Sequence, residues 1–502
     1  MKKIINQWAL YPFFIPLILI FNELRSVYFD YISLGFYDKL VFSMIIFFTN
    51  ITIYVLAYLL LKNKIKAGIL ILMPLMFLDF YFDAFNYLIQ LSFIKPLYLI
   101  IGFKVHKLAL FFLSVITLLL FIYFRRSKLR FVKFNLYLNI VFGIFLCIEI
   151  VKYTSTILNT HELKLENTFN TPIKFTKNTD SLPDIYFVIF DSYTGNASLR
   201  RYWNYDNLDI QSFLIGKGFL VPTFAQSCYN GTTFSIPSFL NASYINIQNK
   251  SEADKTRCID LVDLLRHNQI SKELLNYGYK FQEYSIFNRK PKPDLQSFFI
   301  ENLYYRTFFY LVQEKFFGLK NVNYSLVNES NFKKLLEVKK HESPVIHYAY
   351  FYMPHCPYLF DSTGKEIYDK NICYDCLNKE AYKEQLIYTN SKIKIITNHI
   401  LKVDPKSIII FQADHGFRFL FDIDAKDRRE EGFSIFQAIY LPNKNYKNIA
   451  DTTYSVNTFR YVFNNYFGTN LPVLKGKKVN VGDENEIKDI FNSQMRKINL
   501  KN

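Results

Sequence analysis

The stretch "SIIIFQADHGF", Ser407 to Phe417, is an apolar run that ends abruptly in an acid and a histidine. Its apolar residues, Ile408 to Phe411, have the length and composition of a buried strand. Asp414 and His415 would then stand at the tip of that strand. A core strand followed by a polar turn accounts for this pattern, and so does a metal site at the carboxyl edge of a sheet.

Two further apolar runs end in the same way. One occupies residues 185–190 and stops at Asp191, and the other, "VIHYAYFYMPH" from Val345, stops at His355. The segments between the runs carry apolar residues at helical spacings of three and four. Buried strands that alternate with helices predict an α/β domain with a central, mostly parallel sheet and helices on both faces. The expected helices are residues 208–219, 296–318 and 381–403.

The three strand ends should share one edge of this sheet, because parallel strands present their carboxyl ends together, and ligands bind there. A lone Asp or His after a strand is usually a cap or turn residue. Together, Asp191, Asp414 and His415 offer two oxygens and one nitrogen, a set that suits Zn²⁺ or Mn²⁺. The sequence therefore predicts a divalent metal as cofactor.

A candidate nucleophile lies in "SCYNGTTFSIPSFLN", Ser227 to Asn241. Gly231 allows a close backbone approach, and Thr232 follows it at the start of an apolar segment of helical character. A hydroxyl at a helix N-terminus and next to a metal would be favoured as the alkoxide. The alternative is an ordinary threonine N-cap.

The first 155 residues differ from the rest because they contain long uncharged runs. Five runs approach the ~20 residues that cross a bilayer as a helix. Residues 88–103 are also apolar, but Lys95-Pro96 in their middle favours an interfacial or re-entrant segment. The pattern predicts a five-span membrane domain over residues 1–155. The spans are about 8–22, 40–61, 68–83, 108–124 and 134–154.

Basic residues cluster beside three of these spans, at Lys2-Lys3, at 62–66 and at 125–133. The positive-inside rule places such clusters on the cytoplasmic side. Five spans then put the large C-terminal part on the extracytoplasmic side of the cell membrane. The net charge of +17 favours an anionic partner. No Arg-rich stripe accompanies it, so we do not expect nucleic-acid binding.

The remaining chain divides by composition. Residues 156–183 are polar, and we expect them to form a linker. We expect residues 184–475 to form the catalytic domain and residues 476–502 to form a polar tail. Five of the six cysteines lie beyond residue 155. "CYDC", at Cys373 and Cys376, could be half of a zinc site, but no second such pair completes it. One or two disulfides in an oxidising compartment are favoured instead.

Four segments, taken in order, resemble the sulfatase-like enzymes of the alkaline phosphatase superfamily. They are most similar to membrane-bound bacterial members with five spans and an outward catalytic domain, the phosphoethanolamine transferases and lipoteichoic acid synthases. A late segment, "SVNTFRYVFNNYFG", also looks like these proteins. The four segments are "YFVIFDSYT", "SCYNGTTFSIPSFLN", "MPHCPYLFDSTG" and "IIIFQADHGFR".

The resemblance implies a role for each matching residue. Asp191, Asp414 and His415 match metal ligands, and Thr232 matches a threonine that contacts the metal and becomes covalently phospho-modified. His355 matches a substrate-binding or proton-transferring histidine. We add Arg418, which could bind a phosphate through its forked guanidinium. The implied activity is transfer or hydrolysis of a phospho-group on lipid-linked or envelope glycan substrates, with membrane lipids as partners.

Two alternatives stay open. A sulfatase would need an arginine in its C/S-x-P-x-R motif, but "SIPSF" places Phe239 there. A sulfatase-like domain without turnover could instead bind envelope components. The transferases commonly supply another histidine after the Asp-His motif, whereas His415 is the last histidine of this chain.

Overall fold

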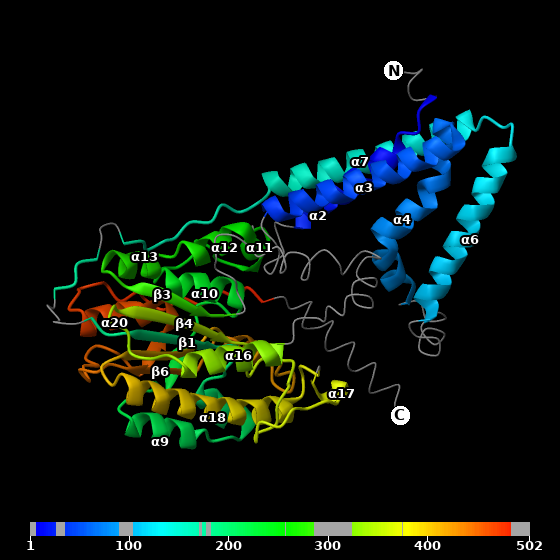
Figure 1. Ribbon diagram of the computed structural model, residues 1–502. Coiled ribbons are helices and arrows are strands. Elements are labelled where there is room, and N and C mark those ends of the chain that lie inside the picture. The colour runs from blue at the N-terminus through cyan, green and yellow to red at the C-terminus, as the bar shows by residue number, and fades with distance from the viewer. Residues whose placement is uncertain are drawn as a thin grey trace. The chain divides into compact units, whose positions relative to one another are not determined.

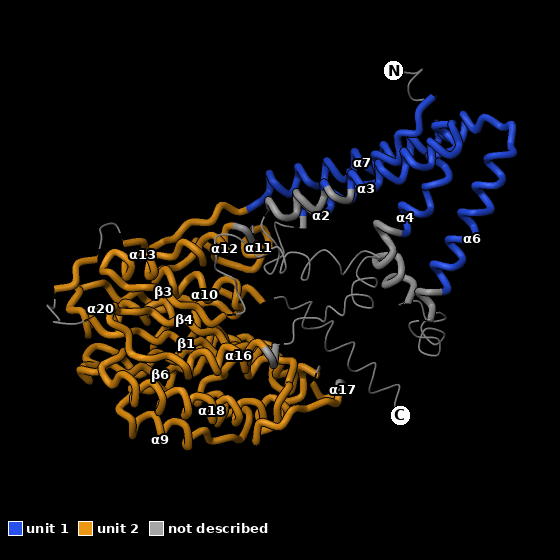
Figure 2. Tube along the Cα trace, viewed as in Figure 1, with its two compact units in different colours: residues 1–160, 292–322 blue, residues 161–291, 323–502 orange. Residues whose placement is uncertain are grey.

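The computed structural model divides the chain into two compact units, coloured in Figure 2. One is helical and contains residues 1–160, and the other contains residues 161–291 and 323–502. A third stretch, 292–322, is grouped with the first unit but lies outside the described residues. The structure describes residues 7–26, 36–89, 104–169, 173–176, 182–256, 258–285, 324–373 and 375–482.

A helix coincides with each of the five expected spans (Figure 1). Among the described residues, two stretches could cross a membrane by length and composition, Leu108–Arg126 and Val132–Leu158. Two shorter apolar helices are Tyr11–Asn22 and Phe47–Leu61. Most of the ambiguous stretch 88–103 lies outside the described residues. The helices are α2 (Tyr11–Ser26), α3 (Phe36–Leu61), α4 (Lys64–Ile89), α6 (Lys104–Arg126) and α7 (Val132–Leu158).

Polar side chains satisfy backbone groups at the helix ends of this unit. Asn139 Oδ1 accepts hydrogen bonds from the Leu10 and Tyr11 amides at the start of α2, at 2.7 and 3.3 Å. Lys66 Nζ donates to the carbonyls of Phe124 and Ser127 at the end of α6, at 3.0 and 2.6 Å. Helix ends leave backbone groups without internal partners, and an apolar surrounding makes such groups costly.

The α/β unit is built on a five-stranded sheet in the order β3-β4-β1-β5-β6. All neighbouring pairs are parallel except β5 with β6, which confirms the expected mostly parallel sheet. A second, two-stranded sheet pairs β2 with β7. The strands are β1 (Ile185–Phe190), β2 (Phe224–Gln226), β3 (Lys280–Tyr284), β4 (Val345–Phe351), β5 (Ile408–Ala413), β6 (Gln437–Tyr440) and β7 (Thr452–Tyr454).

Helices cover both faces of the large sheet, as expected. In Figure 1, α9 (Leu208–Gly216) and α18 (Lys379–Val403) lie on one side, and α10 (Thr232–Leu240) and α20 (Thr458–Tyr466) lie on the other. The expected helix 296–318 lies outside the described residues. The remaining helices are α8 (Asn196–Trp203), α11 (Lys250–Asp254), α12 (Cys258–Arg266), α13 (Gln269–Asn276), α16 (Tyr324–Leu336), α17 (Lys370–Cys373) and α19 (Ala425–Glu431).

The central strand β1 explains why its sequence is apolar at every position. Tyr186, Val188 and Phe190 pack into the cluster that contains residues of α9 and α18. Ile185, Phe187 and Ile189 pack into the opposite cluster, with residues of α10 and α20. A strand that is buried on both faces reads as a continuous apolar run rather than an alternation.

Strand register places the polar loop residues together. Phe190, the last residue of β1, is aligned with Phe351 of β4 and with Ala413 of β5. The next residues, Asp191 and Asp414, therefore leave the sheet side by side. His355 follows four residues after the end of β4.

The stretch that the sequence marked as a linker, 156–183, contacts the α/β unit where it is described. Leu165 forms a β-bridge with Ile245. The Ile173 amide donates to Glu273 Oε2 at 3.1 Å, and the Phe175 ring stacks on Tyr277 with centroids 3.8 Å apart.

Candidate metal centre

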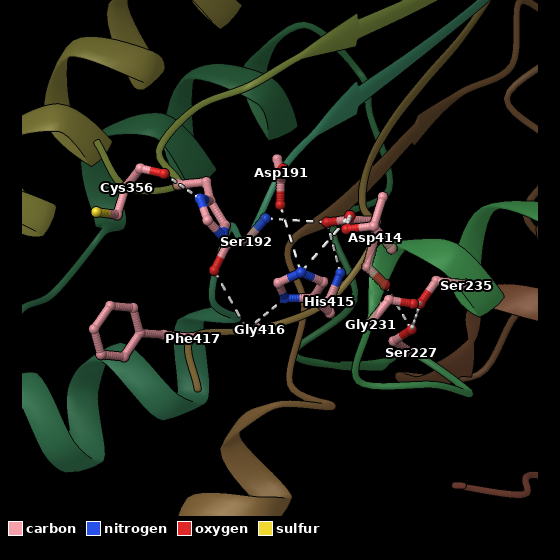
Figure 3. A network of polar contacts seen from close by, with 12 residues as sticks. Asp191, Ser192, Ser227, Gly231, Ser235, Cys356, Asp414, His415, Gly416 and Phe417 are labelled. Atoms are coloured by element: carbon pink, nitrogen blue, oxygen red, sulfur yellow. Dashed lines mark hydrogen bonds and ion pairs between the residues drawn. The ribbon is translucent and has the colours of Figure 1, made fainter. Parts of the chain in front are cut away.

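Asp191, Asp414 and His415 converge at the carboxyl edge of the sheet. Each offers one ligand atom, and these atoms all lie within 4.8 Å of one another. All three side chains are buried, at 2%, 0% and 1% exposed. Figure 3 shows them pointing toward one another from the loops that follow β1 and β5. Residues far apart in sequence thus form the cluster that the strand ends predicted.

Asp414 divides its two oxygens between the backbone and the cluster. Its Oδ1 accepts hydrogen bonds from the amides of Ser192 and His415, at 3.0 and 2.8 Å. Its Oδ2 accepts a hydrogen bond from Thr232 Oγ1 at 2.7 Å. The two amides fix the carboxylate plane, so that Oδ2 faces the cluster and the threonine.

Asp191 has one satisfied and one orphaned oxygen. Tyr350, on the neighbouring strand β4, donates its hydroxyl to Oδ2 at 2.5 Å. Oδ1 is buried and has no hydrogen-bond partner among the described residues. Burial, reinforced by the nearby Asp414 charge, raises the pKa of Asp191 well above its ordinary value. A buried carboxylate that faces a second carboxylate is costly without a cation between them.

His415 presents an unprotonated nitrogen to this pair of acids. Its Nδ1–H donates to the Gly416 carbonyl at 2.8 Å, and this bond assigns the free lone pair to Nε2. Nε2 lies 3.5 Å from Asp191 Oδ1 and 3.8 Å from Asp414 Oδ2. Burial lowers the pKa of His415, so the ring is held neutral. A neutral imidazole oriented by a backbone carbonyl is the usual form of a metal-binding histidine.

These features fit a divalent cation. The donor set has two carboxylate oxygens and one imidazole nitrogen, Asp191 Oδ1 lacks a hydrogen-bond partner among the described residues, and the two acids outnumber the single guanidinium within electrostatic reach. The same set suits Zn²⁺ and Mn²⁺. The cofactor expected from the sequence therefore agrees with the chemistry of the cluster, which does not distinguish between the two ions.

Two unusual backbone positions build the cluster. Ser192 adopts a left-handed conformation, with φ of 61°, and its amide thereby reaches Asp414. Gly416 passes so close to the end of α19 that an added Cβ would lie 2.1 Å from the carbonyl oxygen of Glu431, its last residue. Only glycine fits there, which explains the third residue of the Asp-His-Gly motif.

Thr232 is the first residue of α10, as the sequence predicted. Its N-cap is Gly231 in an extended conformation. The hydroxyl therefore combines a position at a positive helix end with a hydrogen bond to a cluster carboxylate. Ser235, the residue that a sulfatase would modify, is instead buried, and its hydroxyl donates to the carbonyls of Tyr229 and Gly231 at 2.8 and 2.9 Å.

His355 lies next to this group. Its ring centroid is 6.2 Å from that of His415. Nδ1–H donates to the carbonyl of Cys356, which leaves Nε2 as an acceptor. Burial, followed by the charges of His415 and Arg418, lowers the pKa of His355 to about 3. The ring is therefore neutral at physiological pH.

A disulfide anchors the loop that carries His355. Cys356 is bonded to Cys376, and Gln385 Nε2 donates to the His355 carbonyl at 2.9 Å. Among the described cysteines, Cys147, Cys228 and Cys373 are free, and Cys258 is not described at the side-chain level. The single disulfide agrees with the expectation of one or two, and it does not use the CYDC pair as a unit.

Arg418 adds a positive charge near the metal-ligand side chains at the carboxyl edge of the sheet. Its positive charge lowers the pKa values of Asp191 and His355, which places it within electrostatic reach of both. Its Nε is buried and has no hydrogen-bond partner among the described residues. A guanidinium with an unused donor beside a metal cluster is suited to bind a phosphate oxygen.

The structure adds two residues to the site that the sequence did not single out. Tyr350 reads as one more core aromatic in "VIHYAYFYMPH", and only its register beside Asp191 reveals the hydrogen bond. Ser227 donates its hydroxyl to the Asp414 carbonyl at 2.6 Å. Nothing in the local sequence distinguishes either residue from ordinary structural ones.

The opposite end of β1 carries a second acid and histidine. Asp184 Oδ1 accepts a hydrogen bond from the Val345 amide at 2.7 Å. His347 Nε2 lies 3.9 Å from Asp184 Oδ2, and its ring stacks on Tyr186 with centroids 4.4 Å apart. Burial lowers the pKa of His347. Among the described residues, this pair is not part of a group of three metal-ligand side chains.

Comparisons with known proteins give similar solved structures only. No protein-family model and no curated protein sequence matches the chain. The C-terminal periplasmic domain of EcEptC from Escherichia coli matches with a TM-score of 0.40 and 10% identity, over 61% of this chain and 87% of that one. A zinc complex of the same domain matches with a TM-score of 0.38 and 11% identity, over 62% and 86%.

Two further solved structures extend this set. The periplasmic domain of the phosphoethanolamine transferase EptC from Campylobacter jejuni matches with a TM-score of 0.35 and 14% identity, over 59% of this chain and 92% of that one. The phosphonate monoester hydrolase SpPMH from Silicibacter pomeroyi matches with a TM-score of 0.38 and 11% identity, over 59% and 76%. At these values the comparisons assign no activity, and the support for one comes from the residues of the site.

Proposed function

We propose that this protein is a membrane-anchored, metal-dependent enzyme that transfers or hydrolyses a phospho-group through Thr232. The observation that carries the proposal is the 2.7 Å hydrogen bond from Thr232 Oγ1 to Asp414 Oδ2, at the N-terminus of α10 and beside a buried set of metal-ligand atoms. A threonine that served only as a cap would not need a buried metal-ligand carboxylate as its partner.

The charges of the site favour an anionic substrate once a cation is bound. Asp191 and Asp414 outnumber the single guanidinium of Arg418, so the residues alone repel anions. A divalent ion would be held by Asp191, Asp414 and His415, and it would lower the pKa of the Thr232 hydroxyl and neutralise charge on a phosphoryl oxygen. The edge then becomes net positive, as an anionic phosphodiester requires.

The residues of the chain suggest a two-step displacement. Thr232 Oγ1 attacks the phosphorus, its proton leaves along the hydrogen bond to Asp414, and the bond between phosphorus and the donor oxygen breaks with its electron pair on that oxygen. Arg418 holds the non-bridging oxygens of the phosphoryl group. An acceptor hydroxyl then attacks the phospho-threonine, and the bond between phosphorus and Thr232 Oγ1 breaks with its electron pair on that oxygen, which recovers the proton held by Asp414. The acceptor's proton passes through His355 Nε2 to the donor oxygen freed in the first step, and the low pKa of His355 means that the ring holds it only in transit. A glycan or lipid acceptor makes the enzyme a transferase, and water makes it a hydrolase.

The cellular setting follows from two features outside the cluster. Two helices are long and apolar enough to cross a membrane, and the Cys356–Cys376 disulfide suits an oxidising, extracytoplasmic compartment. We therefore propose a multi-pass anchor in the cell membrane and lipid-linked or envelope glycan substrates at its outer surface. Anchoring would confine the enzyme and such substrates to one surface.

The test uses two chromogenic esters on the full-length, detergent-solubilised protein. We expect bis(4-nitrophenyl) phosphate to be cleaved after addition of Zn²⁺ or Mn²⁺ and to be left intact with a chelator. 4-Nitrophenyl sulfate should not be cleaved, because Ser235 is buried and bonded and Phe239 replaces the arginine of a sulfatase. Cleavage of the sulfate alone would favour a sulfatase. Metal binding without cleavage of either ester would favour a binding protein.

A further inference from the structure

A short segment near the end of the chain lies along the loop that carries Thr232. This segment, Val479–Gly482, is called the C-terminal strap below. The Val479 amide donates to the Cys228 carbonyl at 2.9 Å, and Val479 forms a parallel β-bridge with Tyr229. The side of the strap that carries Val479 and Val481 is buried, with 2% and 9% exposure. The sequence assigned these residues to a polar tail, but they pack against the catalytic loop.

Asn230 ties the strap to that loop with its side chain. Its Oδ1 accepts hydrogen bonds from the amides of Val481 and Gly482, at 2.7 and 3.1 Å. Its Nδ2 donates to Asn480 Oδ1 at 2.6 Å. Asn230 is 5% exposed and stands two residues before Thr232. The side-chain amide of Asn230 therefore makes all three of these hydrogen bonds with the strap. Little of its hydrogen-bonding capacity is left for a substrate.

The strap also lies close to both reacting parts of the proposed site. An added Cβ on Gly231 would lie 3.2 Å from Val481 Cγ2, so the strap packs against the residue that precedes the nucleophile. An added Cβ on Gly482 would lie 3.6 Å from Arg418 Nη1. On another side of Arg418, a Cβ on Gly432 would lie 3.5 Å from its Cγ. Both distances are those of ordinary van der Waals contact, so Arg418 lies close to two glycines, one of which belongs to the strap.

We infer that the C-terminal strap is part of the active site and that Asn230 is a positioning residue. It would fix the spacing between the attacking oxygen of Thr232 and the guanidinium of Arg418. This inference rests on the proposed function, because it assumes that Thr232 attacks a phosphoryl group held by Arg418. The physical reason is that displacing a reacting group by about 1 Å can lower a rate by about 10²-fold.

The test compares variants that remove different numbers of these bonds in the full-length protein. Asn230→Ala removes all three, Asn480→Ala removes one, and Asn480→Asp keeps the acceptor for Asn230 Nδ2. With bis(4-nitrophenyl) phosphate as the probe, we expect kcat to fall about 10- to 100-fold for Asn230→Ala. The fall should be smaller for Asn480→Ala and largely restored in Asn480→Asp. Zinc affinity should stay unchanged in all three, because no metal ligand is altered.

A matched control separates positioning from a loss of stability. Asn268 is equally buried, at 1% exposed, and its side chain accepts from the Ser271 amide and donates to the Leu265 carbonyl, both at 2.8 Å. Asn268→Ala should lower the melting temperature and leave kcat at the parent value. If Asn230→Ala has the parent kcat, or if it loses zinc binding as well, the inference is overturned. Asn480→Ala decides the question if Asn230→Ala does not fold.

The outcome also distinguishes this inference from the proposal it rests on. If Asn230→Ala keeps the parent kcat while Thr232→Ala is inactive, the proposed role of the strap is overturned and the assignment of Thr232 as nucleophile stands. Parent activity in both variants would overturn the proposed function itself.

Discussion

The two ends of strand β1 carry similar residues in different settings. At its carboxyl end, Asp191 meets a second acid, a histidine nitrogen and a threonine hydroxyl. At its amino end, Asp184 lies near His347, and its Oδ1 accepts a hydrogen bond from the Val345 amide. Aromatic rings, including those of Tyr186 and Tyr284, stack against that histidine.

The two ends of β1 differ in how much negative charge is buried without a balancing positive charge, rather than in residue type. At the amino end, a single acid is bonded to the backbone, and the neutral histidine packs among rings as a core residue does. At the carboxyl end, burial and repulsion from Asp414 raise the pKa of Asp191. An orphaned oxygen does not separate the two ends, because Asp184 Oδ2, like Asp191 Oδ1, is buried without a hydrogen-bond partner among the described residues. A buried pair of acids persists only where something positive binds between them. An acid beside a histidine is therefore a weak sign of a metal site, and a second acid is the decisive addition.

The largest effect should come from removing the nucleophile, which only the carboxyl end possesses. We expect Thr232→Ala to lower the rate of phosphodiester cleavage by at least ~10³-fold, because no other hydroxyl among the described residues donates to the Asp414 carboxylate. Zinc content and the melting temperature should stay close to those of the parent. Steady-state kinetics and metal analysis of the same preparation give both numbers. A variant that retains the parent rate would show that the threonine is only a helix residue.

Exchange of one acid at each end tests the comparison directly. Asp414→Asn should abolish stoichiometric zinc binding, since it removes a charged ligand from the cluster. Asp184→Ala should keep the zinc and lower the free energy of unfolding by about 1–3 kcal/mol, because the buried Val345 amide loses its acceptor. Metal analysis and denaturant unfolding of the two variants provide the measurement. Loss of zinc in Asp184→Ala alone would reverse the assignment of the two ends.

Tyr350→Phe tests whether the Tyr350 hydroxyl orients Asp191 for metal binding at the carboxyl end of β1. The change removes the hydroxyl that orients Asp191 Oδ2 and leaves the ring in the core. Groups that orient metal ligands typically contribute 10- to 100-fold to metal affinity, and we expect a loss of about that size in a competition assay with a chromogenic chelator. Tyr348→Phe, on the same strand, is the matched control. Equal affinities in the two variants would mean that the Tyr350 hydroxyl has no such role.

The smallest effect concerns pH in the metal-free protein. Because the pKa of Asp191 is raised in the folded state, its contribution to stability is greatest at low pH. This contribution is lost as pH rises above the unfolded value of about 3.9 toward the folded value. The melting temperature of the chelated parent should therefore fall, relative to Asp191→Asn, as pH rises above about 4. Zinc should remove this fall, and a parallel pH dependence of the two proteins without metal would contradict the raised pKa.

The sequence was sufficient for the parts of the fold that depend on local patterns. Nearly continuous apolar runs located β1, β4 and β5, because strands buried on both faces are apolar at most positions. His347 in β4 and Gln412 in β5 are the buried polar exceptions. The stops at Asp191 and at Asp414-His415 located the cluster, since parallel strands bring their ends to one edge. Glycine at 416 belongs to the same motif, although the carbonyl that requires it is that of Glu431, at the end of α19.

The remaining parts depend on contacts between distant segments. Tyr350 and Phe351 look alike in the sequence, and only strand register gives the tyrosine hydroxyl an acid to bind. The residues beyond Lys475 have the composition of a tail, but Val481 and Gly482 are bonded to Asn230, some 250 positions away. The Cys356–Cys376 pairing likewise requires the folded loop around His355. Such pairings leave no periodic signal for a single sequence to reveal.

Mass spectrometry of peptides from protein briefly exposed to bis(4-nitrophenyl) phosphate tests the central claim most directly. A nucleophilic threonine predicts a phospho-adduct on the peptide that contains Thr232, formed in the presence of Zn²⁺ or Mn²⁺ and absent in Asp414→Asn. Cleavage of the ester by the parent protein with no adduct at Thr232, or with an adduct on another residue, would contradict the account.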